Sequence, residues 1–101
     1  MEARFAEPSV LILISLAGGP KHGYALIKDI EEIAGATLGP GTLYGALSRL
    51  EQRGLVEALP AEERRRPYRI TATGAAAVQA YLEHARQVAN LGLRRLGAAH
   101  A

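Results

Sequence analysis

Six of the twelve basic residues in this 101-residue chain fall within one 21-residue stretch that contains only four acidic residues. They are Arg49, Arg53, Arg64, Arg65, Arg66 and Arg69. Because the formal net charge is only +2, the clustering is more informative than the total charge. Guanidinium groups bind phosphate oxygens, often through two hydrogen bonds at once. The stretch is therefore a candidate nucleic-acid-binding patch.

Residue types suited to other chemistry are sparse. The chain has no cysteine, which excludes disulfides, thiolate metal sites and cysteine nucleophiles. None of the histidines, His22, His84 and His100, has a second histidine three or four positions away, so no zinc site is predicted. The serines have no histidine and carboxylate that the sequence can place beside them. We therefore predict that the chain is not an enzyme and uses no metal or cofactor.

Composition indicates one folded domain. Hydrophobic residues make up 49% of the chain and charged residues 22%. The one apolar run, residues 10–17, is far shorter than the ~20 residues of a membrane span, and the acidic Glu2 and Glu7 precede it. Neither a signal peptide nor a membrane anchor is expected, and the lack of cysteine favours a cytoplasmic location.

Three short helices are predicted in the first half of the chain. Pro8 can begin the first helix, which the Gly18-Gly19 pair ends. A second amphipathic helix spans residues 24–34, and Pro40 begins a third that stops at Gly54. The apolar positions of the second and third helices are Tyr24, Ile27, Ile30, Ile33, Ala34, Leu43, Leu47 and Leu50.

A charged hairpin and a long last helix are predicted in the second half. Strand-like segments at residues 55–59 and 67–71 flank a charged loop. Thr71 or Thr73 can cap a helix that runs to about Leu96, with Gly92 as a late interruption. At 1.5 Å per residue this helix would be roughly 36 Å long, more than a small three-helix core can cover, so we expect a homodimer. The expected interface residues are Val78, Tyr81, Leu82, Ala85, Val88 and Ala89.

The order helix, helix, helix, strand, loop, strand is that of a winged helix-turn-helix domain. We expect a fold that is mainly α with a small β-hairpin, with residues 1–71 as the DNA-binding domain and residues 72–101 as a C-terminal dimerisation helix. The third helix of such a domain enters the major groove, and the hairpin loop, or wing, contacts the phosphate backbone or the minor groove. The predicted DNA-binding residues are Gly41, Thr42, Tyr44, Ser48, Arg49, Arg53, Arg64, Arg65 and Arg66.

Some of these residues have a second interpretation. Tyr44 can either donate to a phosphate or bury its ring, and we favour the phosphate. Tyr68 is expected to pack in the core instead. The arginines at 64–66 could be ordinary solvent-exposed charges of a loop, and the negative charges of Glu62 and Glu63 partly offset them. A different class of function is also open: a winged helix that docks on another protein, whose binding, unlike that of DNA, would not weaken steeply with salt.

The sequence also resembles the PadR family of transcriptional regulators over nearly all of its length. The stretches that carry the resemblance are the apolar first helix with His22-Gly23-Tyr24, residues 39–51 (GPGTLYGALSRLE), residues 54–56 (GLV), and Tyr68-Arg69-Ile70-Thr71 with Gly74. The resemblance implies a repressor that a small molecule or another signal releases from its operator, with residues 40–53 as the DNA-contacting helix. The chain departs from the family pattern at Gly45, where proline is common, and in a wing without glycine.

A two-fold dimer would read a pseudo-palindromic operator whose half-site centres lie about one helical turn (~10–10.5 base pairs), or a multiple of it, apart. The resemblance implies a small-molecule effector, but the sequence does not identify it. Candidate residues for lining its pocket are Phe5, Tyr81 and Val88.

Overall fold

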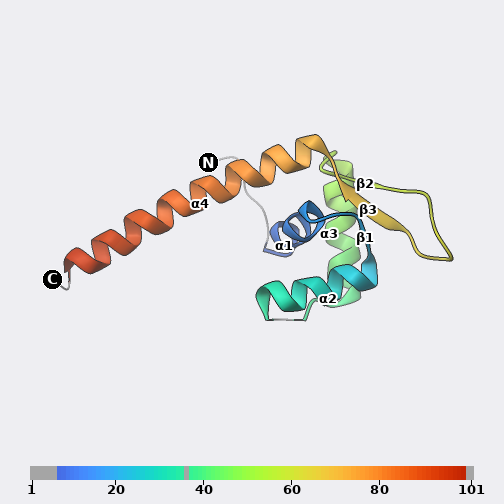
Figure 1. The fold of residues 1–101 in the computed structure, drawn as a ribbon, viewed down its shortest axis with the longest axis horizontal. Coiled ribbons are helices and arrows are strands. Elements are labelled where there is room, and N and C mark those ends of the chain that lie inside the picture. The colour runs from blue at the N-terminus through green and yellow to red at the C-terminus, as the bar shows by residue number, and fades with distance from the viewer. Residues whose placement is uncertain (1–6, 36, 100–101) are drawn as a thin grey trace.

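The computed structural model describes residues 7–35 and 37–99, in which a compact body of short elements carries one long projecting helix (Figure 1). In chain order the elements are α1 (Glu7–Ala17), β1 (Lys21–His22), α2 (Gly23–Ala34), α3 (Pro40–Gln52), β2 (Val56–Ala58), β3 (Pro67–Ile70) and α4 (Ala72–Ala99). The predicted class, mainly α with a small β element and a winged helix-turn-helix order, is confirmed. Phe5 lies outside the described residues.

Aliphatic side chains from α1, α2 and α3 form the core between those helices. The predicted inward stripe of α3, Leu43, Leu47 and Leu50, is fully buried. Burial of apolar surface contributes roughly 25 cal/mol per Å², so this core supplies most of the favourable free energy of folding. The other core residues are Ile12, Leu13, Leu16, Leu26, Ile30, Ala46, Leu55, Val56 and Val78.

The face that α2 buries only partly matches the predicted stripe, because Ile30 is buried and Ile27 packs against the core while other predicted positions are exposed. Tyr24 and Ile33, both expected on the apolar stripe, are 66% and 43% exposed. The buried positions of α2 are Gly23, Leu26 and Ile30. Leu26 and Ile30 lie one helical turn apart, on the side of α2 that packs against α1 and α3. The spacing of three along Tyr24, Ile27, Ile30 and Ile33 pointed to a stripe that only partly coincides with this face.

β1 adds a third strand that the sequence analysis did not predict. The sheet order is β1-β3-β2 with antiparallel pairs, and Tyr68 of β3 lies opposite Lys21 on one side and Ala58 on the other. A strand of two residues has no periodicity to detect, so sequence patterns cannot reveal it. Its consequence is that the start of α2 is attached directly to the hairpin.

α4 begins at a threonine cap and runs without a break. The N–H of Gly74 donates to Oγ1 of Thr71 at 2.9 Å, so Thr71 rather than Thr73 is the cap. The predicted interruption at Gly92 is wrong, because α4 continues to Ala99. One glycine costs a helix only about 1 kcal/mol relative to alanine, which the flanking turns absorb. None of the described helices has both the length and the apolar composition of a membrane span.

The first turns of α4 are tied to the body. Val78 is only 5% exposed and belongs to the core, so it has little surface left for a partner chain, contrary to its predicted place in a dimer interface. Gly74 lies so close to the backbone of Leu55 that a Cβ added there would overlap the carbonyl group. That carbonyl is itself held by the N–H of Thr71 at 3.1 Å.

We therefore expect Gly74→Ala to destabilise the protein by about 1–3 kcal/mol, the usual cost of overpacking against atoms that cannot move. The control is Gly97→Ala, at a helical position where an added Cβ meets nothing within 4 Å. It should stabilise the chain slightly, since alanine is the better helix former. Chemical denaturation of both variants tests this, and equal midpoints would contradict the close approach at Gly74.

Candidate nucleic-acid interface

α3 presents polar residues on the side opposite its leucine stripe. Thr42, Ser48 and Arg49 are all exposed, as the sequence predicted. The helix is unbroken at Gly45, so the departure from the family pattern there does not interrupt it. The missing side chain leaves space that Arg49 uses: its Nη1 lies 3.5 Å from the point where a Cβ on Gly45 would be. Arg49 therefore extends back along α3 toward its N-terminus.

Glycine and proline residues with particular backbone conformations set the two ends of α3. Gly39 is the N-cap in an extended conformation and Pro40 supplies the preset φ of the first turn, which leaves the N–H of Gly41 near the exposed end of the helix. At the other end, Arg53 is the C-cap and Gly54 adopts a left-handed φ of 75°, followed by a hydrogen bond from the N–H of Leu55. Gly41 and Arg53 therefore lie at opposite ends of the exposed surface of α3.

Tyr44 rests against the beginning of α2. Its side chain is 50% exposed, so the ring is not part of the core. A Cβ added at Gly23 would overlap the Tyr44 hydroxyl, which means that the ring can approach α2 only because residue 23 has no side chain. The sequence analysis did not identify Gly23 as a residue that positions Tyr44.

Tyr68 lies on β3, partly buried against the core, as predicted. Its pKa is raised from the ordinary tyrosine value, first because burial disfavours the phenolate and then because Glu51 and Tyr44 contribute negative potential. Arg66 opposes these effects. Tyr68 therefore links the wing to the core.

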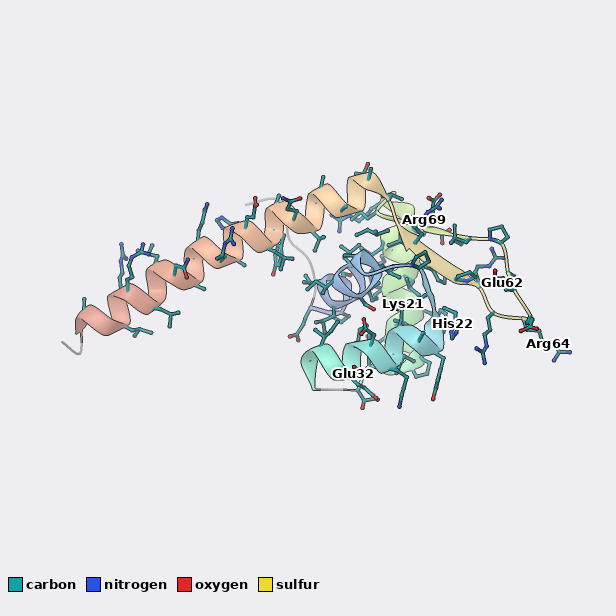
Figure 2. All side chains as sticks on the ribbon, viewed as in Figure 1. Lys21, His22, Glu32, Glu62, Arg64 and Arg69 are labelled. Carbon is teal, nitrogen blue, oxygen red and sulfur yellow. The ribbon has the colours of Figure 1, made fainter. Side chains whose placement is uncertain are left out.

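The wing ends in a two-residue turn of an unusual composition. Glu62 and Arg65 exchange two backbone hydrogen bonds, of 2.6 and 2.7 Å, around Glu63 and Arg64. Both central residues have positive φ, 47° and 70°, the conformation of a type I′ turn. Glycine and asparagine usually occupy these positions. The wing without glycine thus forms a tight hairpin with a charged tip, where Arg64 lies at the outer end (Figure 2).

The wing arginines keep their charge available. Arg66 donates to the carbonyl of Leu59 at 3.0 Å and Arg65 Nη1 lies 3.2 Å from His22 Nε2, while Arg64 makes no ion pair with any described residue. Over the same described ranges, neither Glu62 nor Glu63 forms an ion pair with them. The sixth arginine of the cluster differs, because Arg69 is neutralised by Glu57 at 2.8 Å.

We expect Glu63→Asn to stabilise this turn, because asparagine adopts positive φ more readily than glutamate. Amide hydrogen exchange at Arg65, whose N–H closes the turn, should slow by about two- to fivefold, equivalent to about 0.5–1 kcal/mol. Glu63→Gln is the control, since it removes the same charge without favouring positive φ. Equal slowing in both variants would attribute the effect to charge instead of backbone conformation.

A small pocket joins the wing to the helix-turn-helix. It has a volume of about 160 Å³ and is lined by His22, Gly23, Tyr24, Tyr44, Arg64, Arg65 and Arg66. The structure therefore brings together four predicted site residues, Tyr44 and the three wing arginines. The predicted residues Gly41, Thr42, Ser48, Arg49 and Arg53 do not line this pocket. The His22-Gly23-Tyr24 run entered the sequence analysis only through the family resemblance.

The described residues contain no group of three histidine, cysteine or acidic side chains arranged to hold a metal ion. The chemical capacity of the interface is thus hydrogen bonding and positive charge. Both are suited to phosphate oxygens and to the edges of bases.

Comparison with known proteins identifies the family of this chain. The sequence profile of the PadR-like family of transcriptional regulators matches residues 11–80. An uncharacterised 37.1 kDa protein in transposon Tn4556 of Streptomyces fradiae is 48% identical over 71 residues, which cover 70% of this chain and 21% of that protein. The transcriptional activator GvpE2 of Halobacterium salinarum is 34% identical over 82 residues, 81% of this chain and 39% of that protein. The chain thus spans about a fifth and about two fifths of these relatives.

Solved structures match over a greater share of their length. A transcriptional regulator from Clostridium thermocellum superposes with a TM-score of 0.75 at 29% identity, covering 86% of this chain and 87% of that one. RosR of Halobacterium salinarum gives 0.75 at 28% identity, with 97% and 99% covered. A PadR family regulator from Clostridium difficile shares the fold, with a TM-score of 0.81 at 24% identity over 90% and 99% of the two chains. The chain belongs to the PadR-like family of transcriptional regulators.

Proposed function

We propose that this regulator binds an operator in double-stranded DNA as a homodimer and represses transcription by covering it, in the cytoplasm. The observation that supports DNA as the partner is the pocket in which Tyr44 of α3 meets Arg64, Arg65 and Arg66 of the wing. A helix with exposed hydroxyl and arginine side chains then lies next to a hairpin rich in available cations. This combination is suited to major-groove reading by the helix and to phosphate contact by the hairpin.

A second copy of the chain is the proposed partner of α4. Past its first turns α4 leaves the body and projects away from it (Figure 1), and the molecule measures 58 Å in its longest dimension against 26 and 21 Å in the others. Apolar side chains remain uncovered along it: Leu82, Val88, Leu91, Leu93 and Leu96 are 40–68% exposed. Exposed apolar surface of this extent is typical of an interface.

The interface that we propose follows one stripe of α4. Leu82, Ala85, Ala89, Leu93 and Leu96 recur at spacings of three and four, so they share one side of the helix. The two alanines allow a partner helix to approach closely. Val88 and Tyr81 flank this stripe, with Tyr81 half-buried. Compared with the residues expected from the sequence, Leu93 and Leu96 are added and Val78 contributes little.

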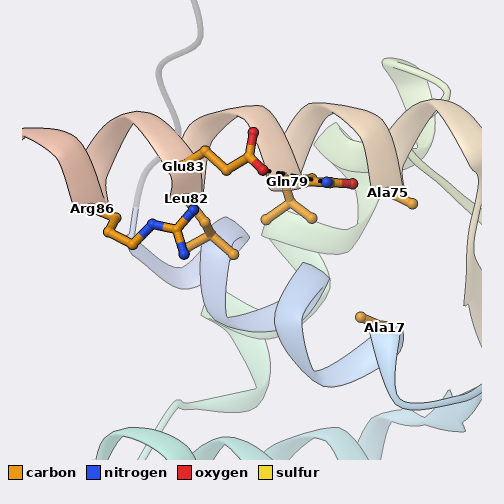
Figure 3. Close-up of a pocket in the computed structure, with 7 residues that line it drawn as sticks. Ala17, Ala75, Gln79, Leu82, Glu83 and Arg86 are labelled. Carbon is orange, nitrogen blue, oxygen red and sulfur yellow. Dashed lines mark hydrogen bonds between the residues drawn. The ribbon is translucent and has the colours of Figure 1, made fainter.

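The small-molecule effector is proposed to bind beside this interface. A groove of about 510 Å³ runs between the end of α1 and the first turns of α4 (Figure 3). Val78 and Leu82 contribute apolar side chains to its lining, while Gln79, Glu83 and Arg86 contribute polar groups, with Gln79 donating to Glu83 at 3.5 Å. Tyr81 and Val88 do not line it. An apolar groove with few polar groups is the usual form of a ligand site.

Repression requires only that the dimer occupies its operator, since a bound dimer that overlaps a promoter excludes the polymerase. Activation, the function in the name of the halobacterial relative, is the alternative outcome of a reporter assay. A reporter placed behind the selected operator should fall in activity when the regulator is expressed. A rise would identify an activator that binds the same DNA.

The experiment that tests DNA binding is selection of bound duplexes from genomic fragments, followed by a salt titration on the selected site. We expect a pseudo-palindromic footprint with two protected half-sites and an affinity that falls steeply with salt. Protection of a single asymmetric half-site would contradict the two-fold dimer. Failure to select any duplex, together with salt-insensitive binding to a protein, would show that the chain is a protein-docking adaptor and not a DNA-binding regulator. Repeating the selection with metabolites present identifies the effector.

A further inference from the structure

The pocket between α2, α3 and the wing has the chemistry of an anion site. Three of its lining residues are arginines, and no carboxylate is among them. Tyr24, which α2 leaves 66% exposed, lines the same pocket. The N-terminus of the 12-residue helix α2 also begins here, and helix N-termini favour negative charge. Positive charge, hydroxyl groups and a helix dipole therefore converge on one small space.

The hydrogen bonds of His22 indicate where an anion would bind. Nδ1 of His22 accepts the N–H of Ala25 at 3.4 Å and so caps α2. A neutral imidazole has only one acceptor nitrogen, so it cannot accept from both Ala25 and Arg65, and in the tautomer that keeps the helix cap the proton lies on Nε2. That N–H faces Nη1 of Arg65 at 3.2 Å, and a guanidinium can only donate. In that tautomer two donors face each other, and an anionic oxygen beside them would accept from both.

We propose that this pocket binds one phosphate of the DNA backbone, held jointly by His22 and Arg65. The proposal rests on the proposed DNA-binding function and adds a contact residue from outside α3 and the wing. His22 lies on β1, opposite Pro67 of β3. A phosphate shared by His22 and Arg65 would therefore fix the wing against the start of α2, so that α3 and the wing engage DNA as one unit.

Two variants separate the phosphate contact from the helix cap. His22→Asn keeps a good N-cap acceptor but removes the Nε2–H, and His22→Asp keeps the cap and adds a charge that repels phosphate. Both should unfold near the wild-type temperature. On a random-sequence duplex, we expect His22→Asn to lose about fivefold in affinity, typical of one net hydrogen bond, and His22→Asp to lose more.

A double-mutant cycle tests whether the two residues share one phosphate. Arg65→Gln should lower the slope of log affinity against log salt by about 0.9, whereas His22→Asn should leave it nearly unchanged. The combined variant should bind better than the product of the two single losses predicts, because both changes remove the same interaction. Arg94→Gln, at the far end of α4, is the matched control and should behave as wild type.

The outcomes distinguish this proposal from the function on which it rests. Independent, multiplicative losses, or wild-type binding by His22→Asn while Arg65→Gln is weakened, would overturn the shared phosphate and leave DNA binding standing. If wild type binds no duplex, the proposed function itself fails. Inorganic phosphate is the probe for a free ligand: an NMR shift of His22 on its addition, with duplex affinity unchanged in His22→Asn, would assign the pocket to a small anion instead of DNA.

Discussion

Replacing Leu82 with glutamate is expected to convert the protein from dimers to monomers. Leu82 lies one turn beyond Val78, the last core residue of α4, and is 40% exposed in the single chain. In the proposed interface the new carboxylate would be buried in an apolar stripe, where Arg86, one turn further along α4 at the edge of the groove, compensates it only in part. A buried charge that lacks a well-placed partner costs about 3–5 kcal/mol. The dimer dissociation constant should rise by at least about 100-fold, which corresponds to about 2.8 kcal/mol.

The monomer should remain folded, because the substitution lies outside the core. Gln87→Glu is the matched control: it also introduces a carboxylate on exposed α4, but on the side away from the proposed stripe. Light scattering and unfolding curves for both variants separate loss of association from loss of fold. A wild-type protein that is itself monomeric at concentrations on the order of tens of micromolar would refute the dimer. The Leu82→Glu monomer should also protect no more than one half-site of the operator.

Arg49→Ala is expected to weaken binding to the operator by about 1–3 kcal/mol, roughly 5- to 150-fold. Arg49 is exposed on α3, and its guanidinium extends over Gly45 toward the N-terminal part of the helix, which we propose enters a major groove. Because a base contact discriminates between sequences, affinity for random duplex should fall much less. The ratio of the affinity for the operator to the affinity for random duplex should therefore fall.

Arg65→Ala should behave differently, since a phosphate contact has little dependence on sequence. Affinity for operator and random duplex should fall together, and the salt slope should drop by about 0.9 for each phosphate that is no longer neutralised. Arg94→Ala serves as the control for removal of one arginine far from the interface. If neither Arg49→Ala nor Arg65→Ala changes operator affinity or its salt slope, this face of the molecule does not bind DNA.

The elements of this fold could be predicted largely from local sequence. Pro40 and Gly54 bound α3, and the leucines between them recur at a helical spacing, so both ends and the buried face of α3 were predicted correctly. Where two spacings competed, as in α2, the pattern was misleading, since packing against α1 and α3 chose Leu26 over Tyr24. The uninterrupted course of α4 through Gly92 was also missed, because one glycine does not decide a long helix.

The sequence by itself determined the charged stretch, the order of helices and strands, and the long apolar helix, because each depends on residues close together in the chain. Only the tertiary structure decided that β1 joins the sheet and that Val78 belongs to the core. It alone placed His22 within 3.2 Å of Arg65, 43 residues along the chain. The physical reason is that such contacts depend on how separate elements pack. A two-residue strand or a lone histidine has no periodic sequence pattern from which its contacts could be predicted.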